Sequence, residues 1–164
     1  MLRAFLILAF VAGTTAQAME PINVEDTRFA KAQLTVQADG KDHSFTPSQL
    51  EELGTYAMTT DTPWREVPAE FVGVRLTDLL TATGLINVPA IRVIAENDYA
   101  ITMPRDVWMN HELLIATRVD GRGHTRRARG PLQFVFDMSR DPKTAEKDFQ
   151  GNWVWMAARI EPIE

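Results

Sequence analysis

The sequence predicts an α+β domain built from many short strands and only a few short helices. Runs of about four to eight residues rich in β-branched and aromatic side chains recur along the chain, each bounded by turn residues. The helical patterns between them are short, without the long alternating helices of a doubly wound sheet. No glycine-rich phosphate loop interrupts this order, so a nucleotide-binding fold is not expected.

The first elements are predicted from alternation and a turn signal. Residues 32–38 alternate apolar and polar side chains, which is typical of a half-buried strand. The Asp-Gly pair at residues 39–40 is a strong signal for a tight hairpin turn. We therefore expect a second strand at residues 43–45, paired with the first.

Capping residues and leucine spacing predict two helices. Thr46, Pro47 and Gln49 supply an N-cap, an N1 proline and a capping-box glutamine. The helix that they start is expected to end at Gly54. A second helix is expected at residues 76–80, where leucines take helical spacing before another glycine.

The remaining strands are predicted from apolar runs between turn residues. We expect them at residues 56–60, 71–74, 91–95, 99–103, 113–119, 132–136 and 154–160. Residues 96–98 form the turn of a hairpin, and residues 104–108 favour one helical turn. The polar stretch 137–151 is expected to lie at the surface.

Residues 1–18 have the pattern of an export signal. A positive residue precedes the apolar run 4–12, and Ala16 and Ala18 are small residues at the two positions that a signal peptidase reads. The apolar run is far shorter than the roughly 20 residues needed to cross a bilayer. We therefore expect cleavage after Ala18, a periplasmic protein without a membrane span, and one domain over residues 19–164.

The composition excludes several function classes. The chain has 17 basic and 22 acidic residues, and its formal charge of −5 becomes −6 when Arg3 is removed with the signal. This balance argues against general binding of nucleic acid, which needs a basic surface. The chain has no cysteine, so it has no disulfides, no thiolate nucleophile and no thiolate metal ligand.

The titratable residues do not form a metal-binding pattern. His43, His111 and His124 lie far apart, in no ligand spacing, so no metal site is expected. Glu96 and the acid that follows in the same hairpin are most simply a polar tip. Asp61 follows a strand that looks buried, and it can either take part in a site or cap a turn.

A group of arginines concentrates positive charge on the acidic chain. The guanidinium fork suits a phosphate or a carboxylate, so an anion pocket is one interpretation, and pairing with surface acids is the other. The Gly130-Pro131 pair that follows implies a specific backbone path. The group comprises Arg118, Arg122, Arg126, Arg127 and Arg129.

Four tryptophans are many for a chain of this length. Trp153 and Trp155 are expected to share one face of a strand by the period-two rule. Core packing explains one or two of the four, and a partly open aromatic pocket can explain the others. Trp64 and Trp108 complete the set.

Six segments, taken in order, resemble the oxidoreductase molybdopterin-binding domain, the fold of sulfite oxidases and their bacterial relatives. The likeness covers nearly all of the chain after residue 18. The segments are residues 60–64 (TDTPW), 71–80 (FVGVRLTDLL) with Gly84, 97–104 (NDYAITMP), 114–121, 130–132 (GPL) and 155–160.

The resemblance implies a lost metal ligand. Active relatives hold molybdenum through a pyranopterin dithiolene and one cysteine, whose position falls at Thr60, or at Thr59 with a one-residue shift. Tyr99 matches the family's active-site tyrosine. Val154 stands in place of a frequent lysine and Gln133 in place of an arginine, so the resemblance implies the scaffold rather than the molybdopterin chemistry.

Three functions therefore stay open. The first is a non-catalytic module that binds a small anion and serves as a sensing or accessory part of a membrane signalling or redox system. The second is a molybdopterin oxidoreductase without a cysteine ligand, in which Tyr99 stands beside the substrate. The third is an interaction domain with a filled pocket. The pocket residues expected are Thr59, Thr60, Asp61, Trp64, Tyr99, Arg126, Arg127, Arg129 and Gly130.

Overall fold

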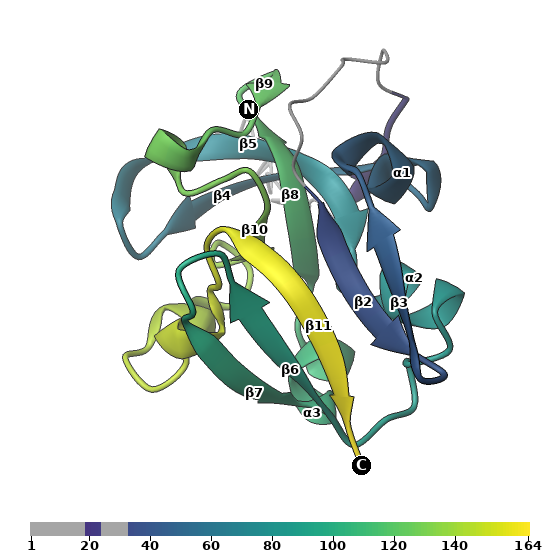
Figure 1. Ribbon diagram of the computed structural model, residues 1–164. Coiled ribbons are helices and arrows are strands. Elements are labelled where there is room, and N and C mark those ends of the chain that lie inside the picture. Colours follow the sequence, from purple (N-terminus) through teal and green to yellow (C-terminus); the bar gives the residue numbers. More distant parts are fainter. Residues whose placement is uncertain (1–18, 24–32) are drawn as a thin grey trace, which may run out of the picture.

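The computed structural model describes residues 19–23 and 33–164, and it shows an α+β fold with two sheets and short helices (Figure 1). The predicted class is therefore confirmed. The expected export signal at residues 1–18 lies outside the described residues. Within the described part of the chain, no helix has the length and apolar character needed to cross a bilayer.

The first sheet has six strands. Its order is β1 (Glu20–Pro21), β4 (Tyr56–Thr62), β5 (Arg65–Arg75), β8 (Leu113–Val119) and β10 (Gln133–Phe136), with β9 (Arg122–Gly123) paired to β8. All of its pairs are antiparallel.

The second sheet has five strands. Its order is β3 (Lys41–Phe45), β2 (Leu34–Ala38), β11 (Ala157–Ile163), β6 (Ala90–Ala95) and β7 (Ala100–Pro104). The pair between β2 and β11 is parallel, and the other pairs are antiparallel. In Figure 1 the last strand, in yellow, lies between β6 and β2.

Short helices connect the strands. They are α1 (Pro47–Glu52), α2 (Leu76–Ala82), α3 (Arg105–Asn110) and the 3₁₀ turns η1 (Arg126–Ala128), η2 (Pro142–Ala145) and η3 (Gln150–Asn152). The predicted capping box of α1 is confirmed: the Gln49 N–H donates to Thr46 Oγ1 at 3.3 Å, and the Thr46 N–H donates to Gln49 Oε1 at 2.9 Å. Gly54 follows the helix with a φ of 140°, a conformation that favours glycine.

Tight turns at Asp-Gly pairs set the hairpins. Asp39 and Gly40 have φ values of 50° and 70°, as a turn with two left-handed central residues requires. Asp120 and Gly121 repeat this with 48° and 72°. The sequence predicted only the end of a strand at the second pair, whereas the structure has the short hairpin of β8 and β9.

The strand β5 is longer than the predicted segment 71–74, because β4 pairs with it from Arg65 onward, whereas β8 pairs only with its last part, Phe71 to Arg75. A register irregularity lies between Val72 and Gly73. A Cβ placed on Gly73 would lie 2.0 Å from the carbonyl oxygen of Ile115. Glycine is therefore required where these two backbones approach each other.

The prediction of a strand from residue 154 was wrong, since β11 begins at Ala157. Met156 has a φ of 52°, which interrupts an extended chain. Its N–H donates to the Arg129 carbonyl at 3.2 Å instead of joining a strand ladder. Trp153 and Trp155 therefore precede the strand, and their expected common strand face does not exist.

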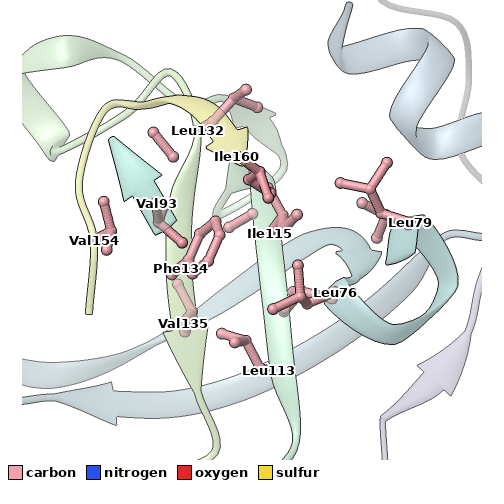
Figure 2. Packing of buried hydrophobic residues seen from close by; sticks show 14 of the residues in the cluster. Leu76, Leu79, Val93, Leu113, Ile115, Leu132, Phe134, Val135, Val154 and Ile160 are labelled. Atoms are coloured by element: carbon pink, nitrogen blue, oxygen red, sulfur yellow. The ribbon is translucent and has the colours of Figure 1, made fainter. Parts of the chain in front are cut away.

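One hydrophobic cluster lies between the sheets and the helices. Ile115 of β8, Phe134 of β10, Val93 of β6 and Ile160 of β11 are fully buried in it, and Leu76 of α2 packs beside them (Figure 2). Residues 137–151 lie mostly at the surface, as expected, although Asp137 and Thr144 are buried. The turns η2 and η3 carry the chain from this core to the functional region.

Candidate functional site

A pocket of about 260 Å³ lies where three chain segments meet. The segments are the turn between β4 and β5, the tip of the β6–β7 hairpin, and the chain from η3 to the start of β11. We call it the aromatic pocket, because four of its six lining residues are aromatic. Its lining consists of Trp64, Asn97, Tyr99, Gln150, Trp153 and Trp155.

Three tryptophans make the pocket walls meet at right angles. The ring of Trp64 lies 4.8 Å from that of Trp155, with 86° between the planes, and 6.1 Å from that of Trp153, with 85°. Edge-to-face contacts of this kind are favourable for aromatic pairs. Trp153 is buried and donates its Nε1–H to the Thr144 carbonyl at 2.8 Å, whereas Trp64 is 37% exposed.

Arg129 adds a positive charge behind the aromatic walls. Its guanidinium carbon lies 4.8 Å from the ring centroid of Trp155 and 5.9 Å from that of Trp64, within the range of cation–π contacts. Its Nη2 donates to the Trp64 carbonyl at 3.4 Å. The φ of Arg129 is 76°, and a left-handed non-glycine residue costs free energy that the surrounding structure has to offset.

Some polar atoms of the lining residues form hydrogen bonds within the protein. The Tyr99 hydroxyl donates to the Gly151 carbonyl at 3.1 Å, and the Tyr99 N–H donates to Asn97 Oδ1 at 3.4 Å. Gln150 Nε2 donates to the Ala145 carbonyl at 2.8 Å. Of these two amides, Asn97 Nδ2 and Gln150 Oε1 make no hydrogen bond with the described residues, so a donor and an acceptor remain for a ligand.

The Trp155 side chain has an unsatisfied donor. Its Nε1–H is buried and has no acceptor among the described residues. Buried polar groups are normally hydrogen-bonded, and each exception requires a physical reason. Trp108 Nε1 and His124 Nδ1, which do not line the pocket, are unsatisfied in the same way, so this donor does not by itself indicate a ligand.

The structure places the predicted site residues in three different settings. Trp64 and Tyr99 line the aromatic pocket, and Arg129 packs behind it. Thr59, Thr60 and Asp61 belong to β4 and are not among the lining residues.

The Thr60 hydroxyl is enclosed. It donates to the Asp61 carbonyl at 3.1 Å and accepts the Met138 N–H at 3.0 Å, and the residue is 1% exposed. Thr59 points to the exposed side of the same strand, as the period of two requires. Thr60 therefore joins β4 to the chain after β10.

The sequence left two interpretations of the arginine group open, pairing with acids and an anion pocket, and the structure shows that different arginines fit each. Arg126 forms a bidentate pair with Glu96 at 2.7 and 2.8 Å, and this hydrogen bonding raises the pKa of Arg126. Arg118 is buried and pairs with Glu51 on α1 at 2.8 Å. Arg127 is exposed on η1, and Arg129 alone of the group packs against the aromatic pocket.

Gly130 and His124 form a close contact beside Arg129. A Cβ on Gly130 would lie 2.7 Å from both the carbonyl carbon and Cγ of His124, so the predicted specific backbone path is found. The Gly130–Pro131 peptide is cis. His124 Nε2 lies 2.8 Å from Gln133 Oε1, and burial lowers the pKa of His124.

His43 and His111 lie outside the aromatic pocket. His43 is exposed on β3, and His111 Nδ1 lies 2.5 Å from Asp141 Oδ2, at a smaller pocket of about 120 Å³. In the part of the chain that the structure describes, no three His, Asp or Glu side chains gather as a metal site would require.

Sequence reasoning missed two lining residues. Asn97 was interpreted only as part of a hairpin tip, and Gln150 lies in the stretch expected to be a plain surface segment. The excess of tryptophans pointed to the pocket, and the resemblance pointed to Tyr99, but neither pointed to these two amides. No family model matches the chain, and no curated protein does.

Proposed function

We propose that this protein is a non-catalytic binding module that holds a small anionic ligand in the aromatic pocket. The observation that carries the proposal is the position of Arg129, whose charged group packs on Trp155 and Trp64 behind a pocket that has no acid among its described lining residues. A guanidinium near a partly buried site attracts an anion more strongly than it does in water, because screening by solvent is reduced.

The charges beside the pocket are mixed. Two acids flank the lining residue Asn97: Arg126 neutralises Glu96, whereas Asp98 is exposed and forms no ion pair with the described residues. Asn97 Nδ2 supplies a further donor at the lining. Arg127 adds an exposed positive charge on the same turn as Arg126.

The left-handed residues around the pocket also support a binding role. Arg129 and Met156 both have positive φ values and are joined by a backbone hydrogen bond of 3.2 Å. Strained backbone of this kind is concentrated at functional sites. Because Trp155 immediately precedes Met156, the strained pair fixes one wall of the aromatic pocket.

The sulfite-oxidase-type fold is part of this proposal. The two sheets and few short helices agree with it at the level of fold class. The molybdenum site of that family, however, does not fit the residues present. Thr60 lies where the resemblance places the cysteine, and its hydroxyl is buried and already hydrogen-bonded to Asp61 and Met138. A protonated hydroxyl used in this way is a poor metal ligand.

The cellular role that we propose is that of a periplasmic sensing or accessory subunit. The export pattern at residues 1–18 supports the compartment. The exposed aromatic side chains of Trp64 and Tyr99, which line the pocket, support a role in contacts with a partner there. The partner would belong to a membrane signalling or redox system, as the resemblance suggests.

Two measurements on the exported, processed protein test the proposal. Calorimetric titration with acetate, benzoate, phosphate and sulfate is expected to show one saturable site, which weakens when Arg129 is replaced by Gln. Molybdenum analysis and fluorescence detection of released pterin are expected to find neither in stoichiometric amount. Stoichiometric molybdenum in protein from a cofactor-competent host would falsify the binding-module proposal.

A further inference from the structure

We infer that the ligand class of the aromatic pocket is an aromatic carboxylate with one or two rings, rather than an inorganic oxyanion. This inference rests on the proposed function and narrows it. It follows from the shape of the walls, the few free polar atoms and the position of the positive charge.

The walls favour a planar ring. Trp64 presents its ring perpendicular to both Trp153 and Trp155, so a flat ligand that packs on one wall meets a second wall edge-on. Both geometries are favourable contacts between aromatic rings. Tyr99 closes another side, and its hydroxyl is held by the Gly151 carbonyl, so its ring is fixed in place.

The pocket offers too few donors for an inorganic oxyanion. Sulfate or phosphate entering an apolar site needs several hydrogen bonds to replace its hydration. The lining supplies Asn97 Nδ2, while the Nε1–H of Trp155 is buried. A carboxylate has fewer oxygens to satisfy than sulfate or phosphate, so it is the anion that this donor-poor lining suits better.

Arg129 supplies charge without taking up ligand space. It is not a lining residue, yet its guanidinium lies 4.8 Å from the Trp155 ring. A carboxylate near the Trp155 edge would therefore have a positive charge close by, with the indole between them. The volume of about 260 Å³ lies at the small end for ligand pockets, which suits a molecule of one or two rings.

Calorimetry with matched small molecules tests the inference. The probes are benzoate, its neutral analogue benzamide, the non-aromatic cyclohexanecarboxylate, acetate and sulfate, each titrated into the exported protein at low salt. Benzoate is expected to bind about tenfold more tightly than cyclohexanecarboxylate because of ring contacts. It is expected to bind about tenfold more tightly than benzamide because of charge.

Variants of Trp64 and Arg129 assign these two preferences to residues. Trp64→Leu is expected to remove the preference for benzoate over cyclohexanecarboxylate, and Trp64→Phe to retain most of it. Arg129→Gln is expected to bring benzoate down to the affinity of benzamide. The matched control is Arg122→Gln, because Arg122 is an exposed arginine on β9, away from the pocket lining. This variant should bind each probe with the affinity of the native protein.

The pattern of outcomes separates this inference from the proposed function. If sulfate or acetate binds as tightly as benzoate, in an Arg129-dependent way, the aromatic class is wrong and the anion site stands. If benzamide binds with the same affinity as benzoate, the proposed function is wrong to require an anion, and only the preference for an aromatic ring stands. If no probe binds, both are overturned.

Discussion

The guanidinium carbon of Arg129 lies 4.8 Å from the ring centroid of Trp155, and the two residues are also linked through the backbone, since the Arg129 carbonyl accepts the N–H of Met156. The same side chain reaches the Trp64 carbonyl on the β4–β5 turn. Arg129 therefore connects the turn after β4, the η1 loop and the chain before β11. The stability of the pocket walls should depend on it.

Replacing Arg129 by methionine keeps much of the side-chain volume and removes the charge. We expect the free energy of unfolding to fall by about 0.5–2 kcal/mol, the range of a partly desolvated cation–π contact. Urea denaturation followed by tryptophan fluorescence measures this loss. Arg127→Met, on the exposed neighbour of the same turn, is the control and should change stability by less than about 0.5 kcal/mol.

Thr60 provides a second prediction, on a residue that the resemblance places at a metal ligand. Thr60→Val keeps the shape and removes one of two acceptors of the Met138 N–H, which also donates to the Phe136 carbonyl at 3.0 Å, so we expect a loss of about 0.5–1.5 kcal/mol in urea denaturation. Thr60→Ser retains the hydroxyl and should cost less. Equal stability of the Val variant and the native protein would show that the hydroxyl has no structural role.

The fold was largely predictable because its signals are local. The capping box at Thr46 and Gln49 and the turn at Asp39 act within four residues of sequence, and each appears in the structure as expected. The start of β11 was not predictable in this way. Met156 leaves the extended conformation because it bonds to Arg129, and no local pattern encodes that distant partner.

The sequence predicted which kinds of residue form the candidate site better than it predicted which positions along the chain line the pocket. Trp64 was expected in a pocket because the tryptophans are in excess, and Tyr99 because the resemblance matches it to the family's active-site tyrosine; both line the pocket. Gln150 was missed because its role depends on how the stretch between β10 and β11 folds back. Thr60 was placed in the pocket wall from the resemblance, whereas its hydroxyl bonds to the chain after β10.

The buried ion pair of Glu51 and Arg118 gives a third prediction. Both side chains are 8% exposed, and Thr117 also donates to Glu51 Oε1 at 2.6 Å. Glu51→Gln removes the carboxylate charge from this buried pair, so we expect a loss of about 3–5 kcal/mol in urea denaturation. Arg126→Gln is the control, because the Arg126 side chain is 68% exposed and its pair with Glu96 should contribute no resolvable stability.

His124 gives the last prediction, on the dependence of stability on pH. Burial lowers the pKa of His124, the hydrogen bond to Gln133 opposes this, and the charges of Arg129 and Arg65 lower it further. In the unfolded chain the pKa of histidine is about 6.5. Below that pH the unfolded state binds a proton that the folded state does not, so the unfolding free energy falls as the pH decreases.

Urea denaturation at pH 7.5, 6.5 and 5.5 measures this effect. We expect the native protein to lose stability below pH 6.5, by at most about 1.4 kcal/mol for each pH unit from this group, and His124→Gln to lose less. The exposed His43→Gln is the control and should keep the native slope. Arg129→Gln removes one neighbouring charge, which should bring the pKa of His124 closer to its unfolded value and reduce the loss. Parallel pH profiles for the native protein and His124→Gln would show that His124 does not titrate differently in the two states.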